Sequence, residues 1–334
     1  MLIKVKRGWE IPERKITPEA LVMSRRGMIR TAGVLALAGA AAGCGPSTTS
    51  QNGPGDTLQA DGGDPNAEKY PATRNAAYVV DREITPELYV TSYNNYYEFG
   101  VEKDDPRRWA NKLPIRPWEI SFEGMVEKEF KTDADSLIKQ MPLEERVYRH
   151  RCVETWSFAV PWTGFPMKAL IALAKPTPSA KYVVMKSFMN PEAAAGQNQV
   201  WVPWPYTEGL TIDEATNDMA FLVTGAYGKP LLKQNGAPLR LATPWKYGFK
   251  STKGIQRFIF TDERPTTYWM ALGSAEYGFW ANVNPKVPHP RWSQATEEVL
   301  GTGERVPTQL FNGYGEQVAM LYKDPSFQNE RLFK

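Results

Sequence analysis

Alternating hydrophobic and polar side chains divide the chain into short strand-like segments rather than long helices. The segment Trp118–Met125 alternates with a period of two, the spacing of a β-strand that buries one face. Further strands are predicted at Tyr182–Phe188, Ala220–Ala226, Leu239–Thr243 and Arg257–Thr261, and helices at Ser136–Gln140, Met167–Lys175 and Ile212–Thr216. Strands and helices do not alternate regularly, which argues against a doubly wound parallel sheet. The pattern predicts an α+β fold in which strands dominate.

The chain around Cys152 is a further candidate strand. If it is extended, Tyr148, His150 and Cys152 share one face, and Val147, Arg149 and Arg151 share the other. The neighbouring basic groups are expected to lower the pKa of the Cys152 thiol and so favour the thiolate that binds soft metals. The next residues, Pro161–Pro166, are expected to turn the chain into the helix at 167–175.

The first 77 residues are predicted to be an export signal followed by a leader, and not part of the folded domain. Arg25 and Arg26 precede an apolar run of about a dozen residues, too short for a membrane span but typical of a signal peptide. The paired arginines match a twin-arginine export signal over residues 1–44. Cys44 is either lipidated or removed by cleavage nearby. Residues 45–77 are predicted to be a flexible leader, and the folded domain is predicted to span residues 78–334.

Composition and charge indicate a soluble globular protein without a nucleic-acid partner. The chain has 334 residues, of which 42% are hydrophobic and 23% charged, and its net charge is +3. The positive excess lies in the first 44 residues, so the remainder carries a small negative net charge. A nucleic-acid-binding domain would present a basic surface instead.

Cysteine usage leaves a single thiol, Cys152, in the predicted domain. It cannot form an intrachain disulfide, so an inert buried thiol, a metal ligand and a nucleophile paired with His150 remain open. The nucleophile ranks below the other two, because no Asn or Asp that would orient the histidine is identifiable. The sequence lacks the glycine-rich loops of nucleotide-binding folds and the cysteine motifs of covalent haem or iron–sulfur centres. Two histidines and one thiol do not suggest a zinc site.

Several separated motifs together resemble the sulfite-oxidase family of molybdoenzymes. They are Tyr93–Phe99, Arg151–Ser157, Asn235–Leu241, Pro244–Lys250, Ala281–Pro285 and His289–Glu297. The similarity runs from about Tyr78 to the C-terminus. It is strongest to the bacterial periplasmic members that reduce methionine sulfoxide in proteins. The resemblance implies a sulfite-oxidase-like molybdopterin-binding fold with a single catalytic domain.

The resemblance also implies a set of site residues. One molybdenum would be held by one molybdopterin and by the thiolate of Cys152, with no internal haem or iron–sulfur cluster. The pterin would be bound by Asn94, Tyr97, Glu98, Ser187, Asn235, Arg240, Ser251, Thr252 and Lys253, with Thr252 acting through its backbone amide. Asn95 and Glu154 would approach the metal where sulfite oxidases place an arginine-rich anion pocket. This difference favours a sulfoxide substrate.

The function implied by the resemblance is repair of methionine sulfoxide in oxidised periplasmic proteins. Electrons would come from a membrane partner that contains haem and is supplied by quinol, and the twin-arginine machinery would export the chain. One alternative is a periplasmic sulfite oxidase-like enzyme or another molybdoenzyme acting on a small S- or N-oxide. Another is a lipidated binding module without metal, in which Cys152 is buried and inert.

Overall fold

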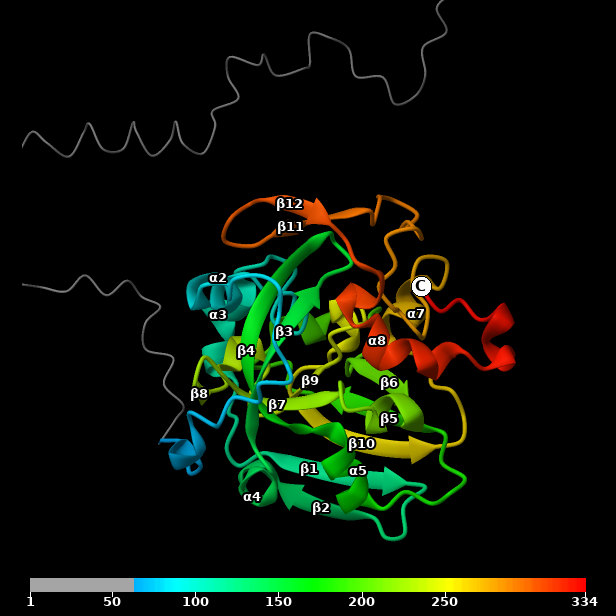
Figure 1. The fold of residues 1–334 in the computed structure, drawn as a ribbon. Coiled ribbons are helices and arrows are strands. Elements are labelled where there is room, and N and C mark those ends of the chain that lie inside the picture. The colour runs from blue at the N-terminus through cyan, green and yellow to red at the C-terminus, as the bar shows by residue number, and fades with distance from the viewer. Residues whose placement is uncertain (1–62) are drawn as a thin grey trace, which may run out of the picture. The chain divides into compact units, whose positions relative to one another are not determined.

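The computed structural model describes residues 63–334, which are built around two mixed β-sheets (Figure 1). The predicted signal segment, Cys44 and most of the predicted leader lie outside these residues. The five-stranded sheet has the order β2-β1-β10-β5-β6, with bounds Phe130–Asp133, Glu119–Gly124, Ile255–Thr261, Tyr182–Ser187 and Thr207–Thr211. Strands β1 and β10 run parallel, and the other pairs are antiparallel.

The seven-stranded sheet carries the Cys152 turn. Its strands are β3 (Glu144–Arg151), β4 (Trp156–Pro166), β7 (Phe221–Ala226), β8 (Lys229–Pro230), β9 (Arg240–Ala242), β11 (Thr296–Val299) and β12 (Arg305–Pro307). Strand β4 pairs with β3, β7 and β11, and β9 pairs with β7. The β3–β4 hairpin pairs Arg151 with Ser157, so residues 152–155 form its turn.

The helices are short. The α-helices are α2 (Glu87–Ser92), α3 (Asp105–Trp109), α4 (Ala134–Gln140), α5 (Met167–Ala174), α6 (Ile212–Thr216), α7 (Tyr268–Gly273) and α8 (Gly315–Val318). The 3₁₀ turns are η3 (Ala67–Lys69), η4 (Ala110–Lys112), η5 (Ala195–Asn198), η6 (Lys233–Asn235), η7 (Gly248–Lys250), η8 (Leu310–Gly313), η9 (Ala319–Tyr322) and η10 (Pro325–Asn329). None of the helices in residues 63–334 has the length and apolar character needed to cross a membrane.

Local chemistry accounts for where these helices begin and end. The carboxylate of Asp133 accepts hydrogen bonds from the backbone N–H groups of Asp135 and Ser136, which caps α4. Thr211 and Glu214 form a reciprocal capping box at the start of α6. Lys175 adopts a left-handed conformation directly after α5 and ends that helix.

The predicted fold class is confirmed: the described residues are built on two β-sheets, and their helices are short. All five alternating segments form strands, and all three helical segments form helices, within two residues of the predicted bounds.

The interpretation of Pro161–Pro166 as a turn is wrong. These residues are the second half of β4, which lies between β3 and β7. Ten of the eleven residues of β4 are buried, so both faces are apolar and the strand shows no alternation. The register shifts between Thr163 and Gly164, and a Cβ on Gly164 would lie only 2.0 Å from the backbone oxygen of Leu222.

Residues before Tyr78, the predicted start of the folded domain, already pack against it. Asn66 is buried, and the hydroxyl of Tyr70 donates to the backbone oxygen of Thr224 at 3.0 Å. Arg74 forms an ion pair with Glu145 on β3 at 2.5 Å. The last part of the predicted leader therefore contacts the seven-stranded sheet.

Candidate active site around Cys152

The turn between β3 and β4 places Cys152 in the wall of a cavity of about 420 Å³. The turn is closed by a hydrogen bond from the Thr155 N–H to the Cys152 oxygen at 3.1 Å, and Thr155 has a positive φ of 66°. Other parts of the cavity wall come from residues 94–98, after α2, and from residues 240–253, which include β9 and η7. Three distant stretches of the chain therefore meet at one thiol.

Asn95 and Glu154 both converge on the Cys152 sulfur. The Asn95 side-chain amide donates to Glu154 Oε2 at 3.0 Å and to Cys152 Sγ at 3.5 Å. The backbone N–H of Glu154 also donates to Cys152 Sγ at 3.5 Å. The Lys103 ammonium lies 2.7 Å from Glu154 Oε2 and 2.5 Å from Asn95 Oδ1, and the Trp156 indole N–H donates to the same carboxylate at 3.0 Å. Asn95, Glu154 and Lys103 thus form one network beside the sulfur.

Burial and hydrogen bonding act in opposite directions on these two acids. Burial, reinforced by the Glu154 carboxylate, raises the pKa of the Cys152 thiol to about 12. Although burial also raises the pKa of Glu154, hydrogen bonds from Asn95, Lys103 and Trp156 lower it below its ordinary value. Glu154 is therefore an anion at neutral pH, while the thiolate of Cys152 requires a cation such as a metal ion to stabilise it.

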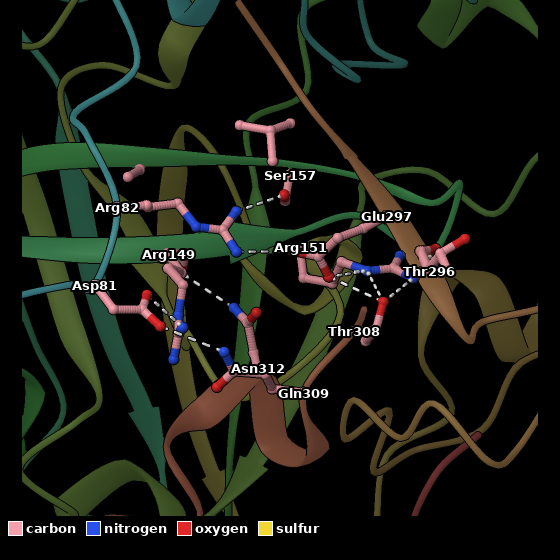
Figure 2. A network of polar contacts seen from close by, with 12 residues as sticks. Asp81, Arg82, Arg149, Arg151, Ser157, Thr296, Glu297, Thr308, Gln309 and Asn312 are labelled. Atoms are coloured by element: carbon pink, nitrogen blue, oxygen red, sulfur yellow. Dashed lines mark hydrogen bonds and ion pairs between the residues drawn. The ribbon is translucent and has the colours of Figure 1, made fainter. Parts of the chain in front are cut away.

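The expectation that basic neighbours leave the thiol with a lowered pKa is wrong, because burial and the Glu154 carboxylate outweigh the lowering effects of Lys103 and Arg151. Two of the basic neighbours lie on the other face of β3 and pair with carboxylates there. The Arg151 guanidinium pairs with Glu297 on β11 at 2.8 Å, and Arg149 pairs with Asp81 at 2.8 Å (Figure 2).

His150 does line the cavity, stacked on the Phe158 ring with centroids 4.7 Å apart. Burial, together with the charges of Arg240 and Lys253, lowers its pKa well below the usual range. No hydrogen bond among residues 63–334 joins His150 to Cys152. The geometry therefore gives no support to a cysteine–histidine nucleophile.

The predicted cofactor residues divide into those that face the cavity and those behind it. The wall includes Asn94, Tyr97, Glu98, Arg240, Ser251 and Lys253. Ser187 instead donates its hydroxyl proton to Glu98 Oε1 at 2.9 Å, and Asn235 donates to Asn94 Oδ1 at 3.3 Å. These two hold side chains that do line the cavity. The Thr252 backbone amide, predicted to contact the pterin, donates to the Lys250 oxygen at 3.1 Å.

The polar groups at this cavity fit an anionic, hydrogen-bonding group such as molybdopterin. Two buried polar atoms have no hydrogen-bond partner among residues 63–334: the side-chain nitrogen of Asn94, which lines the cavity, and the hydroxyl of Thr252, which lies outside the wall between Ser251 and Lys253. Arg240 is buried, and its hydrogen bonds in the same part of the chain go only to the backbone oxygens of Asn235 and Leu241. Burial lowers the pKa of Arg240 to about 10 and also lowers that of Lys253. Positive charge and free donors next to one thiol match the expected ligand set.

An aromatic wall completes the cavity, and the sequence interpretation missed two of its rings, Trp269 and Tyr277. Tyr97 contacts Trp269, Trp269 contacts Tyr277, and Tyr277 contacts Phe249, all with ring centroids 4.9–5.5 Å apart. Trp292 also lines the cavity. Tyr97 was predicted as a pterin contact, and Phe249 and Trp292 lie in quoted motifs, but no motif included Trp269 or Tyr277, because these two rings join the wall through tertiary contacts alone.

Comparison with known proteins shows which family the chain belongs to. Residues 109–269 match the family described as oxidoreductase molybdopterin binding domain. The protein-methionine-sulfoxide reductase catalytic subunit MsrP of Burkholderia mallei (strain ATCC 23344) is 44% identical over 320 residues, which cover 95% of this chain and 94% of that protein. The chain belongs to the MsrP family. The predicted membership of this group of molybdopterin oxidoreductases is confirmed.

A solved structure gives a weaker likeness. The sulfane dehydrogenase SoxCD from Paracoccus pantotrophus aligns with a TM-score of 0.41 and 15% identity. The alignment covers 58% of this chain and 52% of that chain, so the match spans about half of either protein. At this TM-score the likeness carries no argument, and family membership rests on the MsrP relative.

Proposed function

We propose that the chain reduces methionine sulfoxide residues in oxidised periplasmic proteins, using one molybdenum bound to one molybdopterin. The convergence of Asn95 and Glu154 on the Cys152 sulfur, inside a cavity with an aromatic wall, is the observation that carries this proposal. The sulfoxide reductase activity named for the MsrP relative supports the same substrate.

Cys152 would hold the metal, and Arg240, Lys253, Asn94 and Ser251 would hold the pterin. The chemistry that the bound group supplies is two-electron reduction with transfer of the sulfoxide oxygen. The protein contributes the thiolate, a partly buried cavity and hydrogen-bond donors at fixed positions. Arg240 is suited to a bidentate interaction with a phosphate.

The charges beside the sulfur favour a neutral substrate. The Lys103 ammonium is paired with Glu154, and Arg291 at the cavity is paired with Glu276 at 2.8 Å. Each cation already has a carboxylate partner, which weakens its attraction for a sulfite anion, whereas the aromatic wall can contact the apolar part of a methionine sulfoxide side chain. The Asn95 amide can donate to the sulfoxide oxygen.

Proton supply can also be assigned to a side chain of this network. Reduction of a sulfoxide with release of water consumes two protons. The side chain of Lys103 is 26% exposed, so its Nζ can exchange protons with solvent while it lies beside Glu154 Oε2. Lys103 would therefore hold a proton beside Glu154, whose Oε2 lies 3.7 Å from Cys152 Sγ.

Export and electron supply complete the proposal. The twin-arginine pair at Arg25 and Arg26 favours export of the folded chain to the periplasm, with Cys44 as a possible lipid anchor. Because the sequence contains no haem or iron–sulfur motif, electrons would come from a membrane partner that contains haem and is supplied by quinol. Cell fractionation of the wild type and of an Arg25→Lys/Arg26→Lys variant tests the export route.

The decisive test is anaerobic oxidation of a reduced viologen dye by purified protein of known molybdenum content. Dye oxidation that depends on added protein-bound methionine sulfoxide is the expected result. Metal-loaded protein that ignores methionine sulfoxide but acts on sulfite or on another S- or N-oxide would overturn the substrate assignment. Folded protein that acquires no molybdenum in a competent host would instead favour a binding module.

Cys152→Ser is expected to give folded protein that lacks molybdenum and activity. The serine hydroxyl replaces the only thiolate of the cavity wall, and an alkoxide forms far less readily at neutral pH. Metal analysis and the dye assay check both losses, while the thermal midpoint of metal-free protein should match that of metal-free wild type. Full activity in this variant would show that Cys152 is not the ligand.

A further inference from the structure

One peptide group in the Cys152 turn is held at both ends. The N–H of Glu154 donates to Cys152 Sγ at 3.5 Å. The carbonyl oxygen of the same peptide, which belongs to Val153, accepts hydrogen bonds from the Trp292 indole and the Gln294 side-chain amide, each at 2.8 Å. Because a peptide is planar, fixing the direction of the carbonyl also fixes the direction of the N–H.

The amide of Gln294 is itself held in one orientation. Its oxygen accepts from Arg151 Nη2 at 2.7 Å, so its nitrogen is the atom that faces Val153. Arg151 is fully buried and bound to Glu297 Oε2 at 2.8 Å and to Thr308 Oγ1 at 3.2 Å, as Figure 2 shows for these three side chains. A flipped Gln294 amide would turn its NH₂ group toward the guanidinium and leave a buried donor unpaired.

Trp292 is held equally firmly. Its ring stacks on His289 with centroids 3.9 Å apart and an interplanar angle of 13°. The Arg291 guanidinium lies 4.8 Å from the ring centroid. Trp292 and Gln294 thus approach the Val153 carbonyl as two fixed donors from the segment just before β11.

We propose that Trp292 and Gln294 are positioning residues that tune the metal's reduction potential by holding the Glu154 N–H on the Cys152 sulfur. The proposal rests on the proposed function only in that Cys152 binds the metal. A hydrogen bond to a ligand sulfur withdraws electron density and stabilises the reduced metal. Loss of the alignment therefore lowers the reduction potential without removing a metal ligand.

The first test is Trp292→Phe, which keeps an aromatic ring and removes the indole N–H. We expect full molybdenum content, a reduction potential below the wild-type value and an altered electron paramagnetic resonance signal of the half-reduced metal. Trp118→Phe is the matched control, because the Trp118 indole also donates to a backbone oxygen, that of Ile255, at 2.9 Å. The control is expected to lose stability and to keep the wild-type potential. Metal-loaded Trp292→Phe with the wild-type potential overturns the proposal.

The second test is Gln294→Glu, alone and combined with Trp292→Phe. The glutamate keeps an acceptor for Arg151 and places a carboxylate where the donor to Val153 stood. We expect a downward shift of the potential in the single variant and a larger one in the double variant. A Gln294→Glu protein that is loaded with metal and has the wild-type potential contradicts the proposal.

If either variant fails to bind molybdenum, nuclear magnetic resonance of metal-free protein can test whether the Glu154 N–H has lost its alignment on the Cys152 sulfur. The Glu154 amide proton should shift and exchange faster with solvent in both variants but not in Trp118→Phe. An unchanged Glu154 resonance overturns the proposal. Dye-mediated titration of the potential needs no sulfoxide, so failure of the proposed substrate and failure of this inference are separate results.

Discussion

Two buried arginines near Cys152 have opposite surroundings. Arg151 is bound to the Glu297 carboxylate, the Gln294 amide and the Thr308 hydroxyl, all buried with it. Arg240 is just as buried, yet within residues 63–334 it donates only to the backbone oxygens of Asn235 and Leu241. Within residues 63–334, the Arg151 guanidinium has a carboxylate counter-ion and the Arg240 guanidinium has none.

The difference separates a structural cation from a binding cation. A buried charge without a counter-ion destabilises a protein unless a ligand provides the opposite charge. Arg151 stabilises the back of the turn that carries the thiol. Arg240 lines the cavity in front of it, where an anionic group would supply its counter-ion under the proposed function. The two arginines should therefore respond in opposite ways to removal of their charge.

The largest expected effect is on stability, from Arg151→Met. Removing one partner of a buried ion pair costs about 3–5 kcal/mol in the free energy of unfolding when it leaves the other charge unpaired. We expect a loss of about 3 kcal/mol, because the Gln294 oxygen loses its donor while Glu297 keeps Arg82 at 3.3 Å as its only cation among residues 63–334. Urea unfolding of metal-free protein measures this loss. The matched control is Arg257→Met, whose pair with Glu123 is largely exposed and should cost less than about 1 kcal/mol. Equal losses in the two variants would contradict the structural role of Arg151.

Alternation predicted most of the fold, and its failure at β4 has a physical reason. Strands such as β10, with residues Ile255–Thr261, are buried on one side only, so their pattern shows in the sequence. Strand β4 is buried on both faces and contains Pro161 and Pro166, which locally resemble turn residues. Pairing with β3 on one side and β7 on the other makes it a strand, and no local pattern reports this pairing.

The sequence predicted the relation between site residues only where they lie close together in one motif. The spacing placed Arg151 and Cys152 on opposite faces of one strand. It could not show that the partner of Arg151 is Glu297, which lies 146 residues further along the chain. In the same way nothing near Lys103 or Trp269 in the sequence points to the sulfur. Both join the site through tertiary packing.

The next effect is on cofactor binding, from Arg240→Met. In metal-free protein the change in unfolding free energy should stay within about 1 kcal/mol, because loss of a poorly paired buried charge offsets loss of its hydrogen bonds. Binding of the pterin should weaken by about 1.5–3 kcal/mol, or roughly 10- to 150-fold, if Arg240 contacts an anionic group.

Pterin fluorescence per mole of protein, measured when the cofactor is limiting, checks this loss, with Arg257→Met again as the control. If Arg240→Met binds as much pterin as the wild type and also loses much stability, Arg240 has the same structural role as Arg151 and the comparison fails.

The smallest effect comes from Asp81→Asn, at the exposed end of the Arg149 pair. The side chain of Asp81 is 63% exposed, so the pair should contribute only about 0.2–1 kcal/mol at neutral pH. Burial raises the pKa of Asp81, but the charge of Arg149 and a hydrogen bond from Gln309 together outweigh it, so the pKa lies below its ordinary value.

A carboxyl whose pKa is lowered on folding stabilises the protein above its unfolded pKa, and this stabilisation is lost as the pH falls through the folded pKa. The stability difference between wild type and Asp81→Asn should therefore be constant near neutral pH and shrink below about pH 4. Urea unfolding at several pH values measures it. A loss as large as that of Arg151→Met would show that exposure does not govern the strength of these arginine pairs.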